Sequence, residues 1–295
     1  MKILVKHYEY FHNYLNKNVG YFIKTALDKH FEVVFQTNTV HDHDQNTWPD
    51  NFSVTTDKKL KLNQFKYAWI YPFEPNLILY LIKLRLFGVK PIIKMDSVIF
   101  SWWRARLLAK LAEWVIVESA AVAKPFGQNP KLKFYSGGLS ESNLDLIATL
   151  KSQINRQKII LYAGRKVSQK GIDRLPKLRP SGWKLKVISN LSGKRYYQTI
   201  LQSSLVILPT RGEGFPNVFS DAFFCRRLFL TTKAAKCAEA INDPTFYPDN
   251  KLSVIRHAVR TVTDQIDYYY RRFDKLYNPD KFQVADDFFA KLLTS

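Results

Sequence analysis

The sequence predicts an α/β protein with two Rossmann-like domains, each a parallel β-sheet with helices on both faces. Short apolar runs rich in β-branched and aromatic residues alternate with longer amphipathic segments, which is the pattern of βαβ units. This pattern starts a second time at Lys158, after a polar stretch over 149–158. We therefore expect one domain at 1–150 and another at 151–279.

The individual elements follow from these patterns in chain order. Ten runs have the composition of buried strands: 2–5, 31–35, 67–71, 91–95, 114–119, 132–136, 158–164, 185–189, 205–210 and 227–232. Helices are expected at 20–30, 102–114 and 196–204, and another is expected to start near Asn217. The segment 280–295 is typical of an amphipathic helix, which we expect to pack back on the first domain.

Composition limits the class of protein. With 46% hydrophobic residues in 295, the chain can bury substantial cores, which excludes a disordered protein. Its two cysteines form neither a disulfide framework nor a metal-ligand spacing, so we expect a reducing, cytoplasmic setting. No secretion signal is visible, and we expect no membrane span, because the apolar stretch 76–93 is interrupted by Lys83, Arg85, Lys90 and Pro91.

The positive charge is unevenly distributed. Residues 151–200 contain thirteen Lys and Arg residues and one acid, Asp173, whereas the whole chain has a net charge of +20. Charge this concentrated indicates an anionic ligand or surface, such as nucleotide phosphates, anionic lipid headgroups or nucleic acid. The alternative is a solvated, solubilising face.

Two loops contain the candidate chemistry, because ligands of parallel sheets bind at the carboxyl ends of strands. In the first loop, Arg165 and Lys170 follow the strand that ends at Gly164, where a helix N-terminus would also favour a phosphate. The alternative is an ordinary basic loop.

The second loop reads RGEGFPNVFSDAFF, over 211–224. Its glycines allow close approach of the backbone to a ligand, and Asn217 is suited to cap the following helix. Glu213 and Asp221 are expected to accept hydrogen bonds from the hydroxyls of a sugar and a ribose. The alternative is a solvated Glu213, with Asp221 paired to Arg226 or Arg227.

Three segments, in order, resemble the family 4 retaining glycosyltransferases of the GT-B fold. The segment 160–175 resembles that family's phosphate loop, and 200–223 resembles its donor-binding strand, loop and helix. Residues 114–126 and 132–142 resemble the strand-and-serine segment and the Gly turn near its domain boundary. The resemblance covers most of residues 110–235.

The resemblance implies roles for individual residues. Arg165 and Lys170 would hold the diphosphate of a nucleotide-sugar, Glu213 the transferred sugar, and Asp221 the ribose. The other residues implied to contact the donor are Gly20, Gly164, Gly214, Phe215, Pro216 and Asn217. No metal or cofactor is implied, because positive side chains would stabilise the leaving diphosphate.

The chain departs from the family at several positions. Asp221 is one methylene shorter than the usual glutamate, and Arg226 and Arg227 stand where a small residue usually follows the donor helix. Lys94 and Asp96 occupy the region of a histidine near the reacting centre, so Asp96 is a candidate to hold a sugar hydroxyl or the acceptor, or else it caps the next helix. The His and Asp residues at 41–44 resemble a metal cluster, but we expect no metal there.

A second candidate surface lies on the helix expected at 102–114. Its basic and aromatic residues suit a membrane interface: Trp102, Trp103, Arg104, Arg106 and Lys110. A core-packed helix with a basic outer face has the same pattern.

The sequence therefore favours a GT-B glycosyltransferase of hexosyltransferase type, with a cleft between its domains. It would transfer sugar from a nucleotide-sugar to a glycan or lipid-linked acceptor, with retention and without a metal. The implied setting is bacterial surface-polysaccharide, lipopolysaccharide or glycolipid synthesis, in the cytoplasm or peripherally on the inner face of the membrane. The alternative is a non-catalytic GT-B-like subunit that binds nucleotide-sugar, lipid or a partner enzyme. Nucleic acid is not an expected partner, because no recognition module is visible.

Overall fold

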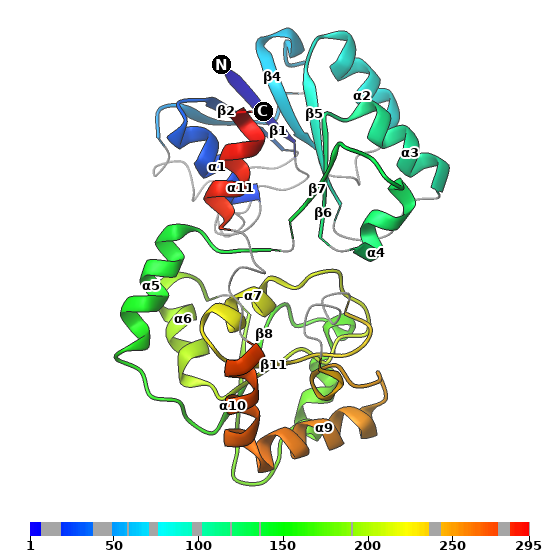
Figure 1. The fold of residues 1–295 in the computed structure, drawn as a ribbon. Helices are drawn as coiled ribbons and strands as arrows, with labels where there is room; N and C mark the ends of the chain where they lie inside the picture. The colour runs from blue at the N-terminus through cyan, green and yellow to red at the C-terminus, as the bar shows by residue number, and fades with distance from the viewer. Residues whose placement is uncertain are drawn as a thin grey trace. The chain divides into compact units, whose positions relative to one another are not determined.

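The structure, a computed structural model, divides the chain into two compact units (Figure 1). The first comprises Met1–Ser136 and Val284–Ser295, and the second comprises Gly137–Gln283. The structure describes residues 1–6, 19–37, 49–57, 59–70, 76–95, 102–118, 120–135, 137–189, 191–235, 243–276 and 284–294.

The first unit contains a parallel sheet in the order β3-β2-β1-β4-β5-β6-β7. Its strands are β1 (Lys2–Lys6), β2 (Glu32–Gln36), β3 (Phe52–Thr55), β4 (Phe65–Ile70), β5 (Lys90–Met95), β6 (Trp114–Val117) and β7 (Leu132–Phe134). The order reverses between β1 and β4, which is the topological switch of a Rossmann sheet.

Helices cover both faces of this sheet, because successive strand side chains point to opposite faces. Ile3 and Val5 of β1 pack on α1 (Val19–Asp28) and α11 (Ala285–Thr294). Leu4, between them, belongs to the core on the other face, with α2 (Leu77–Leu86) and α3 (Trp102–Leu111). The short α4 (Ala120–Ala123) lies on this second face too.

The second unit contains a parallel sheet in the order β11-β10-β8-β9. Its strands are β8 (Ile159–Ala163), β9 (Lys184–Ile188), β10 (Leu205–Ile207) and β11 (Leu228–Leu230). One core joins this sheet to the surrounding helices, which are α5 (Glu141–Lys151), α6 (Gly193–Gln202), α7 (Asn217–Phe224), α9 (Leu252–Asp264) and α10 (Ile266–Leu276).

All ten predicted strands are present, within a few residues of their expected ends. The sequence reading omitted β3, a short strand at the sheet's edge. The predicted boundary at residue 150 also differs from the division after residue 136. The physical reason is that Ile147 and Leu150 of α5 are buried in the second unit's core, where α5 packs on α6.

The C-terminal helix belongs to the first unit. Phe289 of α11 lies 5.8 Å from both Phe22 of α1 and Trp69 of β4, measured between ring centroids. The aromatic side chains of all three residues are fully buried. Burial of this kind explains why an amphipathic helix at the end of the chain returns to the first sheet.

Candidate functional site

The topological switch of the second sheet places two loops side by side. The strand order reverses between β8 and β10, and these neighbours are parallel, pairing Leu205 with Ile160 and Val206 with Leu161. The loops that follow the two strands therefore leave the same edge of the sheet. Ligands of open α/β sheets bind at such a point, and the predicted phosphate and sugar loops both lie there.

Lys170 and Glu213 meet across these loops. The Lys170 ammonium forms an ion pair with a carboxylate oxygen of Glu213, and both side chains are more than four-fifths buried. The Glu213 backbone is also held, because its N–H donates to the Ala234 carbonyl at 3.2 Å. The pair places a cation and a carboxylate together at the switch point. If the ion pair opens, the Lys170 ammonium can bind a phosphate and the Glu213 carboxylate can accept a hydrogen bond from a sugar hydroxyl.

Arg165 supplies a second cation on the β8 loop. Its side chain is exposed and makes no hydrogen bond or ion pair with the residues that the structure describes. The Tyr162 hydroxyl donates to the Arg165 backbone carbonyl at 2.5 Å, which fixes the backbone while leaving the guanidinium available. Burial raises the pKa of Tyr162 to about 12, so this donor keeps its proton at neutral pH.

A close backbone approach joins the two loops. Gly171 has a φ of +77°, and a Cβ there would lie 2.0 Å from the Pro209 carbonyl oxygen. Only glycine permits both the positive φ and the contact. The Lys-Gly pair at 170–171 therefore has two separate functions: the lysine provides charge, and the glycine lets the loops touch.

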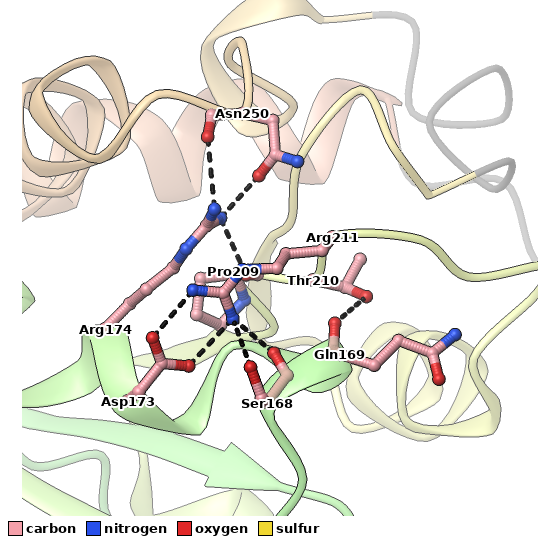
Figure 2. Close-up of polar contacts among 8 residues, drawn as sticks. All are labelled: Ser168, Gln169, Asp173, Arg174, Pro209, Thr210, Arg211 and Asn250. Carbon is pink, nitrogen blue, oxygen red and sulfur yellow. Dashed lines mark hydrogen bonds and ion pairs between the residues drawn. The ribbon is translucent and has the colours of Figure 1, made fainter.

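Polar contacts fix the loops further (Figure 2). The Thr210 hydroxyl donates to the Gln169 carbonyl at 3.0 Å, and the Arg211 N–H donates to the same carbonyl at 2.8 Å. The Arg211 guanidinium binds both carboxylate oxygens of Asp173, at 2.8 and 2.7 Å, and also contacts Ser168. These hydrogen bonds lower the pKa of the Asp173 carboxyl to about 2.

Arg174 ties the same loops to a third segment. Its guanidinium donates to the Pro209 carbonyl at 3.1 Å and to both the side chain and the backbone of Asn250, which precedes α9 (Figure 2). The sequence reading gave no role to Arg174 or Arg211. Their position beside the two glycine-containing loops was the available signal, but which partner each arginine takes depends on the fold.

The segment following the phosphate loop differs from expectation. The chain forms short 3-10 helices at Ser168–Lys170 and Ile172–Leu178 instead of an α-helix, and Pro176 lies inside the second. Proline has no N–H and clashes with the preceding turn. The prediction of a helix N-terminus that favours a phosphate here is therefore wrong, and the loop's positive charge comes from side chains.

The residues from Gly214 to Asn217 form the entry to α7. Phe215 is buried and packs edge-on against Phe219, with ring centroids 5.3 Å apart. Pro216 occupies the cap position and Asn217 is the first helical residue, so the prediction that Asn217 caps the helix is wrong. Gly164 and Gly214 are half-buried; Gly164 directly precedes Arg165, and Gly214 directly follows Glu213.

Asp221 lies inside the second unit, with no exposed surface. Its carboxylate accepts hydrogen bonds from Tyr196 at 2.6 Å and from Tyr197 at 3.5 Å. Both tyrosines belong to α6, so the contacts join α6 to α7. A ribose hydroxyl would need to displace Tyr196 to reach this carboxylate. The burial of Asp221 therefore disfavours the predicted contact with a ribose, which stays a prediction.

Arg226 and Arg227 complete the turn from α7 to β11. Arg226 adopts a left-handed φ of +49°, and Arg227 N–H donates to the Ala222 carbonyl while Arg226 N–H donates to Phe223. This is the hydrogen-bond pattern of a Schellman helix end, usually made with glycine. The buried Arg227 guanidinium donates to the Leu201 carbonyl at 2.9 and 2.6 Å, which satisfies the end of α6.

The remaining predicted residues belong to the first unit. Gly20 is buried in the first turn of α1. Lys94, near the carboxyl end of β5, is fully buried and donates to Glu118, just after β6, at 2.7 Å. Asp96 and the cluster at 41–44 lie outside the described residues. Within the described part of the chain, no group of three or more His, Cys, Asp or Glu side chains is arranged to hold a metal ion.

The predicted aromatic and basic residues of α3 lie at the surface. Trp102 and Trp103 are 58% and 56% exposed, and Arg104, Arg106 and Lys110 are exposed as well. None of the helices in the described segments is long and apolar enough to cross a membrane.

Two Rossmann-like units with parallel sheets define the GT-B fold, and solved structures share it over the whole chain. HepE of Anabaena, solved with UDP and glucose, is similar with a TM-score of 0.70 and 15% identity, covering 100% of both chains. Sucrose-phosphate synthase of Thermosynechococcus elongatus has a TM-score of 0.68 at 12% identity, covering 99% of this chain and 98% of that one.

A protein described as a different type of enzyme is also similar in fold. A Listeria monocytogenes protein assigned as a UDP-N-acetylglucosamine 2-epimerase has a TM-score of 0.60 and 10% identity, covering 100% of this chain and 94% of that one. No protein-family model matches the chain, and no curated protein sequence matches it. At these identities the similarity establishes the fold, and function has to be argued from the site.

Proposed function

We propose that this protein is a glycosyltransferase that takes its sugar from a nucleotide-sugar donor bound by the second unit. The observation that carries the proposal is the pairing of Lys170 with Glu213 at the β8–β10 switch point, together with the exposed guanidinium of Arg165 on the same loop as Lys170. In the donor complex, Arg165 and Lys170 bind the diphosphate, while Glu213 accepts a hydrogen bond from the sugar.

The chemistry follows from these charges. A nucleoside diphosphate gains negative charge on its leaving oxygen as the glycosidic bond breaks, and fixed cations stabilise that charge most where water is scarce. Lys170 is 14% exposed, so its charge acts in partly desolvated surroundings. Glu213 orients the sugar. Gly164 and Gly214 have no side chain and so allow the protein backbone to approach the donor closely, and the conformation of the loop is maintained by Phe215, Pro216 and Asn217.

The fold neighbours support a nucleotide-sugar as the ligand class. HepE of Anabaena has been solved with UDP and with UDP-glucose, and an Escherichia coli neighbour was solved with UDP-2-fluoro glucose. These ligands belong to those proteins, and they motivate UDP-sugars as the first donors to test here.

The finer parts of the proposal rest on the family 4 resemblance. They are transfer of a hexose with retention, without a metal or cofactor, to a glycan or lipid-linked acceptor in surface-polysaccharide, lipopolysaccharide or glycolipid synthesis. Gly20 and Asp96 are proposed to serve the reaction from the first unit, on a protein working in the cytoplasm or at the inner membrane face. The burial of Asp221 leads us to propose a donor site that does not depend on it.

The test is a donor screen by calorimetry and nucleotide release with UDP-, GDP- and ADP-sugars. Replacing Arg165 by Ala, Lys170 by Met or Glu213 by Gln is expected to weaken donor binding or slow turnover by about tenfold to a hundredfold, because each removes a charge-assisted contact. Lys158→Ala is the matched control, since Lys158 precedes β8 and thus lies at the opposite edge of the same sheet.

The outcomes separate three functions. Release of nucleotide that depends on an added glycan or lipid extract supports the transferase. Interconversion of the sugar with the nucleotide still attached would instead indicate an epimerase. A third candidate is the non-catalytic subunit. It is favoured by the burial of Asp221, which leaves this carboxylate unexposed to a ribose, and it would bind a donor without turnover. Failure to bind any donor overturns the proposed site.

A further inference from the structure

Helix α2 exposes an apolar stripe. Its inner residues Leu77, Leu81 and Leu84 are buried in the core of the first unit. On the opposite side, Leu79 is 66% and Leu86 is 81% exposed, and Ile82 and Phe87 are exposed as well. Positions 79, 82 and 86 recur at helical spacing, so they form one stripe. An ordinary surface helix has polar residues on its outer face.

Helix α3 exposes tryptophans combined with arginines. The Arg106 guanidinium lies 3.5 Å from the centre of the Trp102 ring, and that of Arg104 lies 5.2 Å from the centre of the Trp103 ring. These cation–π contacts place a positive charge beside each exposed indole. Tryptophan is enriched where one end of a side chain meets lipid and the other meets water.

The two helices form one continuous surface. They lie side by side over the same face of the first sheet (Figure 1). Arg85 of α2 donates to the carbonyls of Leu111 and Ala112 at 2.8 and 3.1 Å, which fixes the end of α2 to the end of α3. Half of the large hydrophobic residues that are exposed in the described structure lie on this pair: Leu79, Ile82, Leu86, Phe87, Trp102 and Trp103.

The α2 and α3 helices themselves contain cations and no acidic residue. The cations are Lys83, Arg85, Arg104, Arg106 and Lys110. Arg85 pairs with Glu113, just past the end of α3, at 3.2 Å, so the other four supply the excess positive charge. A solubilising face normally mixes both signs. A combination of apolar side chains, indoles and cations without acids complements a surface that is apolar inside and anionic outside.

We propose that the α2–α3 surface docks the first unit onto an anionic lipid bilayer. The apolar stripe of α2 and the indoles of α3 enter the interface, and the arginines and lysines contact lipid phosphates. The excess of positive charge on the two helices favours lipid over a protein partner, and the exposed leucines favour it over nucleic acid, which offers no apolar layer to cover them. This docking does not depend on the donor site.

The test is flotation of the full chain with two kinds of vesicle, pure phosphatidylcholine and an equal mixture with phosphatidylglycerol. Binding is expected only to the mixture. Arg104→Glu with Arg106→Glu should weaken it by about tenfold or more, since each lost cation counts for about fivefold at an anionic surface. Leu79→Gln with Leu86→Gln should weaken it by about tenfold while leaving the salt dependence intact.

Matched controls come from the second unit. Lys158→Glu with Lys184→Glu makes the same charge change, and Val167→Gln with Leu191→Gln changes two other exposed apolar residues. These controls should float like the unaltered protein, and all variants should keep its thermal unfolding midpoint. Absence of binding to the mixed vesicles overturns the proposal, as does equal loss in test and control variants. Loss with the charge pair alone, together with competition by a single-stranded RNA homopolymer, would assign a polyanion site instead.

Discussion

At the scale of the residue, the end of α7 explains how a departure from the usual pattern is accommodated. Arg226 and Arg227 stand where the family that the chain resembles usually has a small residue, and the structure nevertheless keeps a tight turn from helix to strand. Arg226 takes the left-handed conformation that glycine usually supplies, and the Arg227 side chain caps α6. Sequence alone could not predict this, because the cap depends on where the carbonyl of Leu201 lies.

The left-handed Arg226 has a measurable cost. Arg226→Gly is expected to raise the free energy of unfolding by about 1 kcal/mol relative to Arg226→Ala, because alanine keeps the unfavourable φ and glycine relieves it. Comparing these two variants cancels the loss of the exposed contact with Asp274, 4.0 Å away. Urea unfolding measures both. Equal stability of the Gly and Ala variants would contradict the strain at this position.

At the scale of the element, the candidate site could be found from sequence because parallel sheets place their loops by rule. A run of apolar residues predicted β8 and β10, and the charged and glycine residues after them predicted a ligand site at one edge. The partners were not predictable from spacing. Lys170 with Glu213, Arg211 with Asp173, and Tyr196 with Asp221 each join segments at least 25 residues apart in sequence.

The contact between Arg211 and Asp173 gives the loop pair a defined pH response. Arg211 donates two hydrogen bonds that lower the Asp173 pKa to about 2, against an ordinary value of 3.8. A lowered folded-state pKa means that the contact's contribution is fully present above pH 4 and is lost as the pH falls toward 2. The loops should therefore stay joined throughout the neutral range.

Carbon-13 NMR of the Asp173 carboxyl group measures this titration directly. A midpoint near 2 is expected in the unaltered protein, and in Arg211→Gln it should move up toward the ordinary value, since the cation and both donors are lost. Asp249, whose pKa Lys233 lowers on another exposed loop, is the internal control and should not move. An unchanged Asp173 midpoint in the variant would show that the contact with Arg211 does not form in solution.

At the scale of the whole molecule, the sequence predicted two α/β domains but placed their boundary too late. The polar stretch at 149–158 looked like a linker, yet the chain enters the second unit at Gly137. Composition could not reveal this, because α5 has a polar outer side, and which core its apolar residues join depends on the fold: Ile147 and Leu150 are buried in the second unit's core, and Leu144 and Leu146 pack against it. The two units are therefore formed by one chain that leaves the first unit after residue 136 and returns to it at residue 284.

Because the chain returns to the first unit, α11 contributes to the stability of that unit. Phe289→Ala removes a fully buried ring that contacts Phe22 and Trp69, so we expect the first unit to lose about 3–5 kcal/mol. The half-buried neighbour Phe288, stacked on Tyr135 at 4.8 Å, is the matched control on the same helix, and Phe288→Ala should cost less.

Hydrogen exchange read by mass spectrometry distinguishes the units, because amides in a cooperative unit exchange at the rate set by its own opening. Phe289→Ala is expected to accelerate exchange in β1 and β4 and to leave β8 and β10 unchanged. The second unit would then be stable while the first opens, although both termini of the chain belong to the first. Equal acceleration in all four strands would mean that the two cores unfold as one, and that α11 stabilises the entire chain.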